Sequence, residues 1–173
     1  LAEGVLVMPV GFPGGGSNRR ARSPAVLLTP RERLMQEDLL PYAAALEAGA
    51  PLLHVANTIA PTLGGPAQPA SLSSAVMQDL LRTQMGYKGV IVAGPMNGPD
   101  IEHFCDSAQA AILALRAGAD MLYWDGGAAA STRAVAALEK AVQQGVLPEE
   151  TIAAALRRIF AVKRTSRIGM RPL

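Results

Sequence analysis

Short apolar runs alternate with longer amphipathic segments along this chain, and this alternation constrains its fold more than any other feature. Repeated strand–helix units are typical of a parallel sheet with right-handed crossovers. Glycines such as Gly49, Gly86 and Gly118 follow the amphipathic segments, where a glycine commonly ends a helix. The pattern predicts strands over Val5–Val10, Leu52–Val55, Gly89–Ala93 and Asp120–Trp124, and helices over Arg31–Ala48, Ser71–Met85, Ile101–Ala117, Ser131–Gln144 and from Pro148 to Thr165.

Four strand–helix units and a final helix amount to half of an eight-unit barrel, which usually takes about 250 residues. Half of the residues are hydrophobic and 17% are charged, so residues 1–173 are expected to form a single α/β domain with a packed core. A four-stranded parallel sheet leaves two edges unpaired. Either the strands form an open three-layer sheet, or another element completes a barrel.

Several classes of function are disfavoured by the charge pattern. The net charge is +2 and the basic residues are dispersed, so a nucleic-acid partner is not expected. No apolar run reaches the roughly 20 residues of a membrane span, and no signal peptide is visible. We expect a soluble protein and favour the cytoplasm, although a chain that begins at Leu1 can be a processed product or one part of a longer polypeptide.

A series of motifs in one order resembles glycoside hydrolase family 3, and specifically the C-terminal half of the catalytic barrel in its bacterial β-N-acetylhexosaminidase branch. The resemblance covers nearly the whole chain and implies the C-terminal half of a TIM-type (β/α)8 barrel. The motifs are Phe12-Pro13-Gly14-Gly15-Gly16, Arg31-Glu32-Arg33-Leu34, Asp38-Leu39-Leu40-Pro41-Tyr42, Pro69-Ala70-Ser71-Leu72-Ser73, Gly86-Tyr87-Lys88-Gly89-Val90-Ile91-Val92 and Ala117-Gly118-Ala119-Asp120-Met121-Leu122.

The resemblance also implies a retaining hydrolysis, in which a carboxylate attacks the sugar and a second group protonates the leaving oxygen. In the family, the nucleophilic aspartate follows a serine or threonine at the end of the strand that corresponds to Gly89–Ala93. Here Ala93 replaces the hydroxyl residue and Gly94 replaces the aspartate. Because glycine has no side chain, a glycosyl-enzyme cannot form at Gly94.

Other family positions have changed as well. Val10 and Gly11 replace a lysine–histidine pair that binds sugar hydroxyls in the family. By spacing, Ala21 and Ser23 lie where the branch carries its acid/base dyad, and Ala56-Asn57 replaces an alanine–histidine pair. The catalytic residues are therefore expected to be degenerate.

Two acidic residues are candidate substitutes for the missing carboxylates. Asp100 lies six residues after Gly94 and could supply a displaced carboxylate, although we interpret it as the N-cap of the next helix. Trp124 ends the last predicted strand and Asp125 follows it, at a place where a tryptophan can stack on a sugar or fill the core. Asn57 can hydrogen-bond a ligand or satisfy a turn. Asn57, Trp124 and Asp125 are the predicted ligand-binding residues.

No cofactor and no metal site are expected. His54 lies within a predicted strand and is interpreted as a histidine whose hydrogen bonds are satisfied inside the protein. His103 and Cys105 form one His-x-Cys pair without a second pair, which disfavours zinc. The segment Phe12–Gly16 lacks the lysine and hydroxyl residue that end a phosphate-binding loop.

The sequence predicts a structural, assembly or ligand-binding subunit with a degenerate glycosidase site. Its open side is expected to be covered by a second copy or by a separate chain that completes the barrel, and a carbohydrate is the candidate ligand. The alternative is an active β-N-acetylhexosaminidase or β-glucosidase. In that case another chain, or Asp100 and Asp125, would supply the missing groups.

Overall fold

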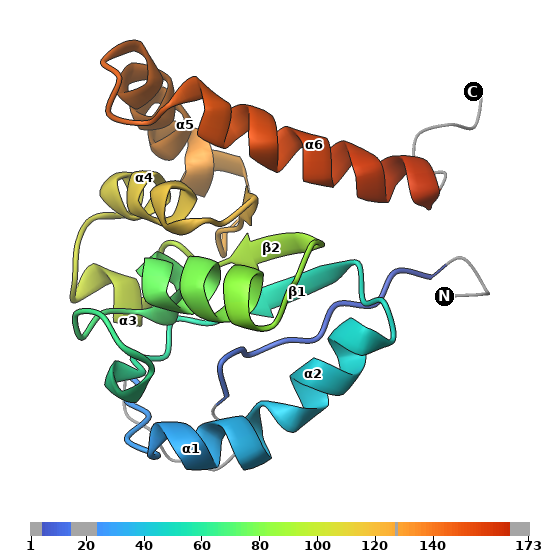
Figure 1. Cartoon of the computed structure of the whole chain (residues 1–173). Helices are drawn as coiled ribbons and strands as arrows, with labels where there is room; N and C mark the ends of the chain where they lie inside the picture. The colour runs from blue at the N-terminus through green and yellow to red at the C-terminus, as the bar shows by residue number, and fades with distance from the viewer. Residues whose placement is uncertain (1–4, 15–23, 127, 167–173) are drawn as a thin grey trace.

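A computed structural model of the chain describes residues 5–14, 24–126 and 128–166 (Figure 1). Strands β1, β2 and β3 form one parallel sheet in chain order, with helical segments between them, so the predicted α/β class is confirmed. The elements are α1 (Arg31–Arg33), η1 (Leu34–Asp38), α2 (Leu40–Glu47), β1 (Leu52–Val55), η2 (Pro61–Leu63), η3 (Ala70–Leu72), η4 (Ala75–Gln84), β2 (Val90–Ala93), α3 (Pro99–Glu102), α4 (Ser107–Ala117), β3 (Met121–Leu122), α5 (Ala128–Gln143) and α6 (Glu149–Thr165).

The sheet places β2 in the centre. Leu52 of β1 pairs with Val90, and Val92 of β2 pairs with Met121. All four residues of β2 are buried, because both of its edges are paired and helices cover the sheet. The bounds of β1 agree with the prediction, whereas β3 is shorter than the predicted Asp120–Trp124.

The first predicted strand is wrong. Residues 5–10 form no regular strand, although they run beside β1: the Pro9 carbonyl accepts from the His54 amide at 2.9 Å, and the Phe12 amide donates to the His54 carbonyl at 3.1 Å. Proline has no amide hydrogen to give to a ladder. Val5 and Val10 are 66% and 64% exposed, so these residues do not pack into the core as a buried strand would.

Two of the predicted helices are less regular than expected. The segment predicted over Arg31–Ala48 divides into α1, the π-helical η1 and α2. The helix predicted from Ser71 begins with the single 3-10 turn η3, and its main part, η4, is π-helical. Ser71 lies in η3, and its buried hydroxyl donates to the side chain of Asn57.

The helix predicted over Ile101–Ala117 is broken into α3 and α4. Asp106 is the N-cap of α4, and its carboxylate accepts from the amides of Ala108 and Gln109 at 2.9 and 3.0 Å. Asp100 is not an N-cap, contrary to the prediction. Gly98 occupies that position in α3 without a side-chain hydrogen bond, and Pro99 takes the first helical position.

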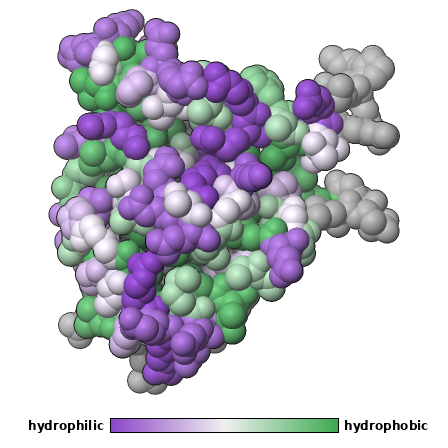
Figure 2. Space-filling model, viewed as in Figure 1, coloured by the Kyte–Doolittle hydropathy of each residue, from purple (hydrophilic) through white to green (hydrophobic). Residues whose placement is uncertain are grey.

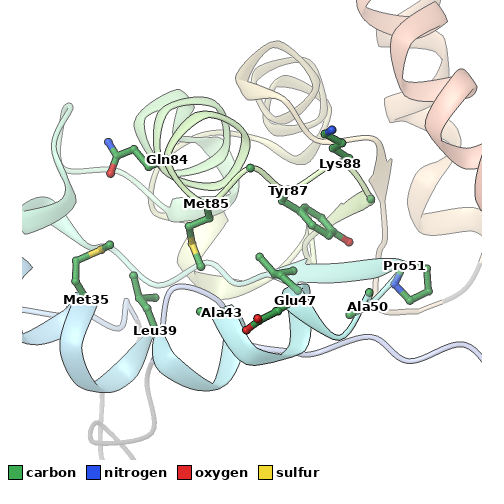
Figure 3. Close-up of a pocket in the computed structure, with 14 residues that line it drawn as sticks. Met35, Leu39, Ala43, Glu47, Ala50, Pro51, Gln84, Met85, Tyr87 and Lys88 are labelled. Atoms are coloured by element: carbon green, nitrogen blue, oxygen red, sulfur yellow. The ribbon is translucent and has the colours of Figure 1, made fainter.

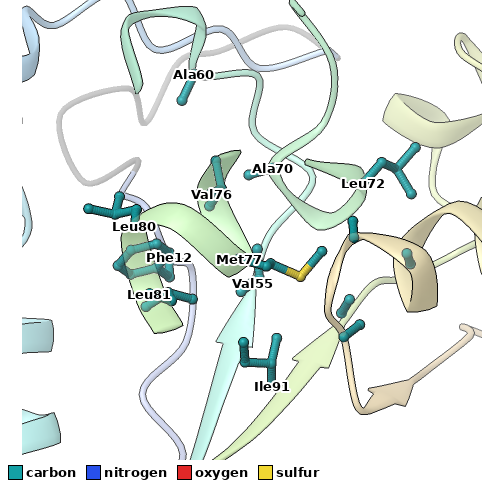
Figure 4. Close-up of a cluster of buried hydrophobic side chains, with 14 of the residues drawn as sticks. Phe12, Val55, Ala60, Ala70, Leu72, Val76, Met77, Leu80, Leu81 and Ile91 are labelled. Carbon is teal, nitrogen blue, oxygen red and sulfur yellow. The ribbon is translucent and has the colours of Figure 1, made fainter. Parts of the chain in front are cut away.

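The main core lies between the sheet and the surrounding helices (Figure 4). Phe12, Val55 and Ile91 meet Met77 and Leu81 of η4, and these five side chains are almost fully buried. A smaller cluster of Leu115, Ala141 and Leu147 joins α4 to α5 and the start of α6. Within the described residues, no helix combines the length and apolar character needed to cross a membrane.

A buried ion cluster fixes α6 against the sheet. The Asp120 carboxylate accepts from Arg82 Nη2 at 2.6 Å, from Arg158 Nε at 2.7 Å and from the Ile91 amide at 2.8 Å. The Asp120 side chain is 0% exposed. Since Arg82 lies on η4 and Arg158 on α6, this carboxylate connects two helices to β2 and β3.

Candidate functional site

The loops after β1, β2 and β3 leave the sheet at the same edge, because the strands are parallel. In α/β folds of this kind, ligands bind at the carboxyl ends of the strands. The residues at this edge are Asn57 after β1, Gly94 after β2, and Tyr123 to Asp125 after β3. These loops are therefore the candidate site.

The Gly94 backbone has no room for a side chain. Its φ angle is +144°, a conformation that residues with a side chain rarely adopt. A β-carbon built on Gly94 would lie 2.7 Å from the Tyr123 carbonyl oxygen and 2.9 Å from the Tyr123 ring. These separations are too short for non-bonded contacts. A carboxylate at position 94 would require the main chain of this loop to move.

His54 of β1 connects the segment before β1 to the loop after β2. The Gly11 amide donates to His54 Nδ1 at 3.2 Å, and His54 Nε2 lies 2.9 Å from the Gly94 carbonyl oxygen. Because Nδ1 accepts a hydrogen bond, the proton of the neutral ring is on Nε2 and is donated to Gly94. Both ring nitrogens therefore have partners within the protein, in agreement with the sequence interpretation.

Asn57 is buried and bonded at both ends of its amide. Its Nδ2 donates to the Pro95 carbonyl at 2.9 Å, and its Oδ1 accepts from the Ser71 hydroxyl at 2.6 Å. The side chain thus ties the loop after β2 to η3. These bonds give Asn57 a structural role, and its ligand-binding role stays a prediction.

Trp124 is half-buried and packs against the main core. Its indole Nε1 donates to the Ser107 hydroxyl at 2.6 Å, which fixes the ring beside the first residue of α4. The polar end of the indole is therefore used inside the protein. Only the exposed part of the ring can contact a ligand.

Asp125 lies in the loop after β3, whereas Asp100 lies on α3. The Asp125 side chain is exposed, and its backbone is bonded reciprocally to Asn97: the Asp125 amide donates to Asn97 Oδ1 at 2.9 Å, and Asn97 Nδ2 donates to the Asp125 carbonyl at 2.7 Å. Asp100 is partly buried in the first turn of α3. Asp125 thus lies at the strand end, beside Tyr123 and Trp124, whereas Asp100 belongs to the helix that follows.

The described residues contain no group of three or more histidine, cysteine, aspartate or glutamate side chains that could hold a metal ion. His103 Nδ1 lies 2.6 Å from the Pro99 carbonyl. Burial, and to a smaller extent the nearby Asp106, raises the pKa of the Cys105 thiol. A thiol that holds its proton is a poor metal ligand.

Ala21 and Ser23, two of the positions expected to be degenerate, lie outside the described residues. The candidate site is therefore defined by the ends of β1, β2 and β3 and by Gly11 to Gly14.

Tyr123 is the site residue that the sequence analysis did not single out. Its ring lies over Gly94 and 5.6 Å from the His54 ring, measured between centroids. Burial, and then the nearby Asp125, raises the pKa of Tyr123, so its phenol stays protonated at neutral pH. The sequence places Tyr123 next to Trp124 near the carboxyl end of a predicted strand, and this position could have indicated a site residue.

Three comparisons place the chain among known proteins. The protein-family model described as "Glycosyl hydrolase family 3 N terminal domain" matches residues 4–162 of this chain. An uncharacterized secreted glycosyl hydrolase of Arthroderma benhamiae is 31% identical over 147 residues, which are 80% of this chain and 41% of that protein. Beta-hexosaminidase A of Pseudoalteromonas piscicida is 29% identical over 133 residues, which are 69% of this chain and 22% of that protein.

A solved structure shows the same fold. The family 3 β-N-acetylglucosaminidase of Paenibacillus sp. superposes with a TM-score of 0.91 at 30% identity, over 99% of this chain and 33% of that one. The chain thus spans less than half the length of these relatives. With its TIM-barrel-like α/β architecture and a family match over most of its length, the chain belongs to glycosyl hydrolase family 3.

Proposed function

We propose that this chain is a catalytically degenerate family 3 domain, the C-terminal half of a (β/α)8 barrel that serves as a structural, assembly or ligand-binding subunit. One observation carries the proposal: Gly94, at the position of the family nucleophile, has a φ of +144° and no space for a β-carbon beside Tyr123. A retaining hydrolysis requires a nucleophile at that place. The hydrogen bond from His54 to the Gly94 carbonyl supports the same backbone conformation.

The activity test uses 4-nitrophenyl N-acetyl-β-glucosaminide, because relatives are named β-hexosaminidase and β-N-acetylglucosaminidase. We expect no release of nitrophenol above the buffer rate from the purified chain or from any assembly that it forms. The Paenibacillus enzyme is the positive control. Gly94→Asp should remain inactive, because the backbone at position 94 does not accommodate the new side chain.

The alternative is an active β-N-acetylhexosaminidase or β-glucosidase that uses Asp100, Asp125 or groups from another chain. The exposure of Asp125 at the end of β3 is the observation in its favour. Hydrolysis by the wild-type chain that disappears in Asp100→Ala or Asp125→Ala would establish this alternative. Turnover that appears only after a second chain is added would assign the missing groups to that chain.

A carbohydrate is the proposed ligand, with Asn57, Trp124 and Asp125 as the proposed contacts. Binding of N-acetylglucosamine or chitobiose is measured from the fluorescence of Trp124, the one tryptophan of the chain. Asp125→Ala should weaken binding, whereas Glu139→Gln, an exposed change on α5, should not. If neither sugar changes the fluorescence or is detected by calorimetry, the proposal reduces to a structural or assembly role.

The unpaired edges of the sheet are the proposed assembly surface. Met121 in the edge strand β3 is 40% exposed, and residues 5–10, which run beside β1, expose Val5 and Val10 at the other edge. Apolar sheet edges are seldom left in water. We propose that a second copy or a separate chain that completes the barrel covers them. A stable monomer in light scattering, with no partner recovered, would count against this.

A further inference from the structure

A hollow of about 650 Å³ lies between α2 and the end of η4 (Figure 3). Ala50 and Pro51, which precede β1, and Gly86 to Gly89, which precede β2, form its inner end. The hollow therefore lies at the amino ends of the strands, whereas Gly94 and Tyr123 lie at their carboxyl ends. It is separate from the candidate site.

The walls of this hollow are apolar and adaptable. Met35, Leu39 and Ala43 follow each other at intervals of four residues, so they share one face of the α1–η1–α2 segment, and Figure 3 shows that face turned toward Met85. Leu39 and Tyr87 are buried and form the floor. The volume is within the range of small-molecule sites, and methionines on opposing walls adjust to ligands of different shape.

Of the residues that line the hollow, Glu47 of α2 carries the carboxylate. Glu47 continues the same four-residue spacing, and its carboxylate has no hydrogen-bond or ion-pair partner within the part of the chain that the structure describes. Both α2 and η4 end at the hollow, and helix C-termini carry partial negative charge. Lys88 is on the opposite wall, and its ammonium group points away from α2 (Figure 3).

We propose that this hollow is a binding site for a small organic cation with an apolar body. The body would lie between Met35 and Met85, above Leu39 and Tyr87, and the ammonium group would lie beside Glu47. This arrangement supplies an unpaired carboxylate to the cation and excludes water from its apolar part. The site is independent of the proposed function, because it uses none of the residues at the carboxyl ends of the strands.

The test compares two probes of the same shape and opposite charge, 4-phenylbutylamine and 4-phenylbutyrate. Binding is followed by NMR of methyl-labelled methionine, with the Met35 and Met85 signals assigned from Met→Leu variants. We expect saturable shifts of both signals with the amine and at least about fivefold weaker binding of the carboxylate. Glu47→Gln should remove this preference, and the matched control Glu139→Gln on α5 should keep it.

A second variant tests the location directly. Ala43→Phe places a ring in the hollow from an exposed position on α2, so it should abolish the shifts at Met35 and Met85 while the far-ultraviolet circular dichroism is unchanged. Equal affinity of the wild type for both probes, or an unaltered preference in Glu47→Gln, would overturn the proposal. Shifts that follow protein concentration without a probe would overturn it too, because a second copy would then occupy the hollow.

Discussion

Replacing Asp120 by asparagine tests whether the buried ion cluster holds η4 and α6 against the sheet. The carboxylate is 0% exposed and accepts three hydrogen bonds, two of them from the guanidinium groups of Arg82 and Arg158. Asparagine has a similar shape but no charge, and its NH2 group would face a guanidinium donor. The variant therefore leaves two cations, both at least partly buried, without their counter-ion.

The expected loss in the free energy of unfolding follows from how deeply the ion cluster is buried. Removing one partner of a fully buried ion pair costs about 3–5 kcal/mol. The side chain of Arg82 is 13% exposed and that of Arg158 is 32% exposed, so water reaches part of the cluster and lowers the cost. We expect a loss of about 3 kcal/mol in the free energy of unfolding, which is a large part of the roughly 5–15 kcal/mol of a typical domain.

The assay is urea unfolding followed by the fluorescence of Trp124 and by circular dichroism at 222 nm. With a slope of about 2 kcal/mol per molar urea, the midpoint should fall by about 1.5 M. Arg157→Gln is the control, because its ion pair with Glu150 is 66% and 73% exposed and should contribute nothing measurable. A shift in Asp120→Asn no larger than that of the control would refute the role of the cluster.

Two further predictions concern Gly94 and Tyr87. Gly94→Ala should destabilise the fold by about 1–3 kcal/mol in the same urea assay, because position 94 has a φ of +144° and lies close to the Tyr123 carbonyl. Gly145→Ala is the control and should destabilise the fold less, because Gly145 has a φ of +69° and open space around it. Equal losses of stability in the two variants would contradict the argument that Tyr123 crowds position 94. Burial raises the pKa of Tyr87 above its usual value of about 10, although Arg82 opposes this. The folded state then keeps a proton that the unfolded chain has lost, so stability should fall as the pH rises above about 10, and Tyr87→Phe should lose less stability between pH 8.5 and 11 than the wild type does.

The sequence predicted helix and strand boundaries well where residues adjacent in the chain decide them. The strand Leu52–Val55 was predicted with its observed bounds, because it is a short apolar run that begins soon after Gly49. The final helix was predicted to begin at Pro148 and begins at Glu149, with Pro148 as its N-cap. The break between α3 and α4 was missed, because the apolar spacing continues through it and only Asp106 indicates a new start.

Errors arose where pairing or packing with distant residues decides the conformation. The apolar run Val5–Val10 is not a strand, since Pro9 has no amide hydrogen for a ladder and the described part of the chain places no strand on the outer side of this run. Ser71 donates its hydroxyl to Asn57, which is fourteen residues away in the chain. A pattern of residues adjacent to Ser71 in the chain cannot indicate that Asn57 is its hydrogen-bond partner.

The amino-acid sequence by itself determined the order of β1, β2 and β3 with helical segments between them, and the absence of a carboxylate at Gly94, because apolar runs, turn glycines and residue identity are local properties. Only the tertiary structure decided that the Tyr123 ring and carbonyl fill the space beside Gly94, and that His54 donates to its carbonyl. Those contacts join a residue of β1 to the loops after β2 and β3. They depend on the parallel register of β1, β2 and β3, which brings the strand ends together and cannot be derived from any one segment.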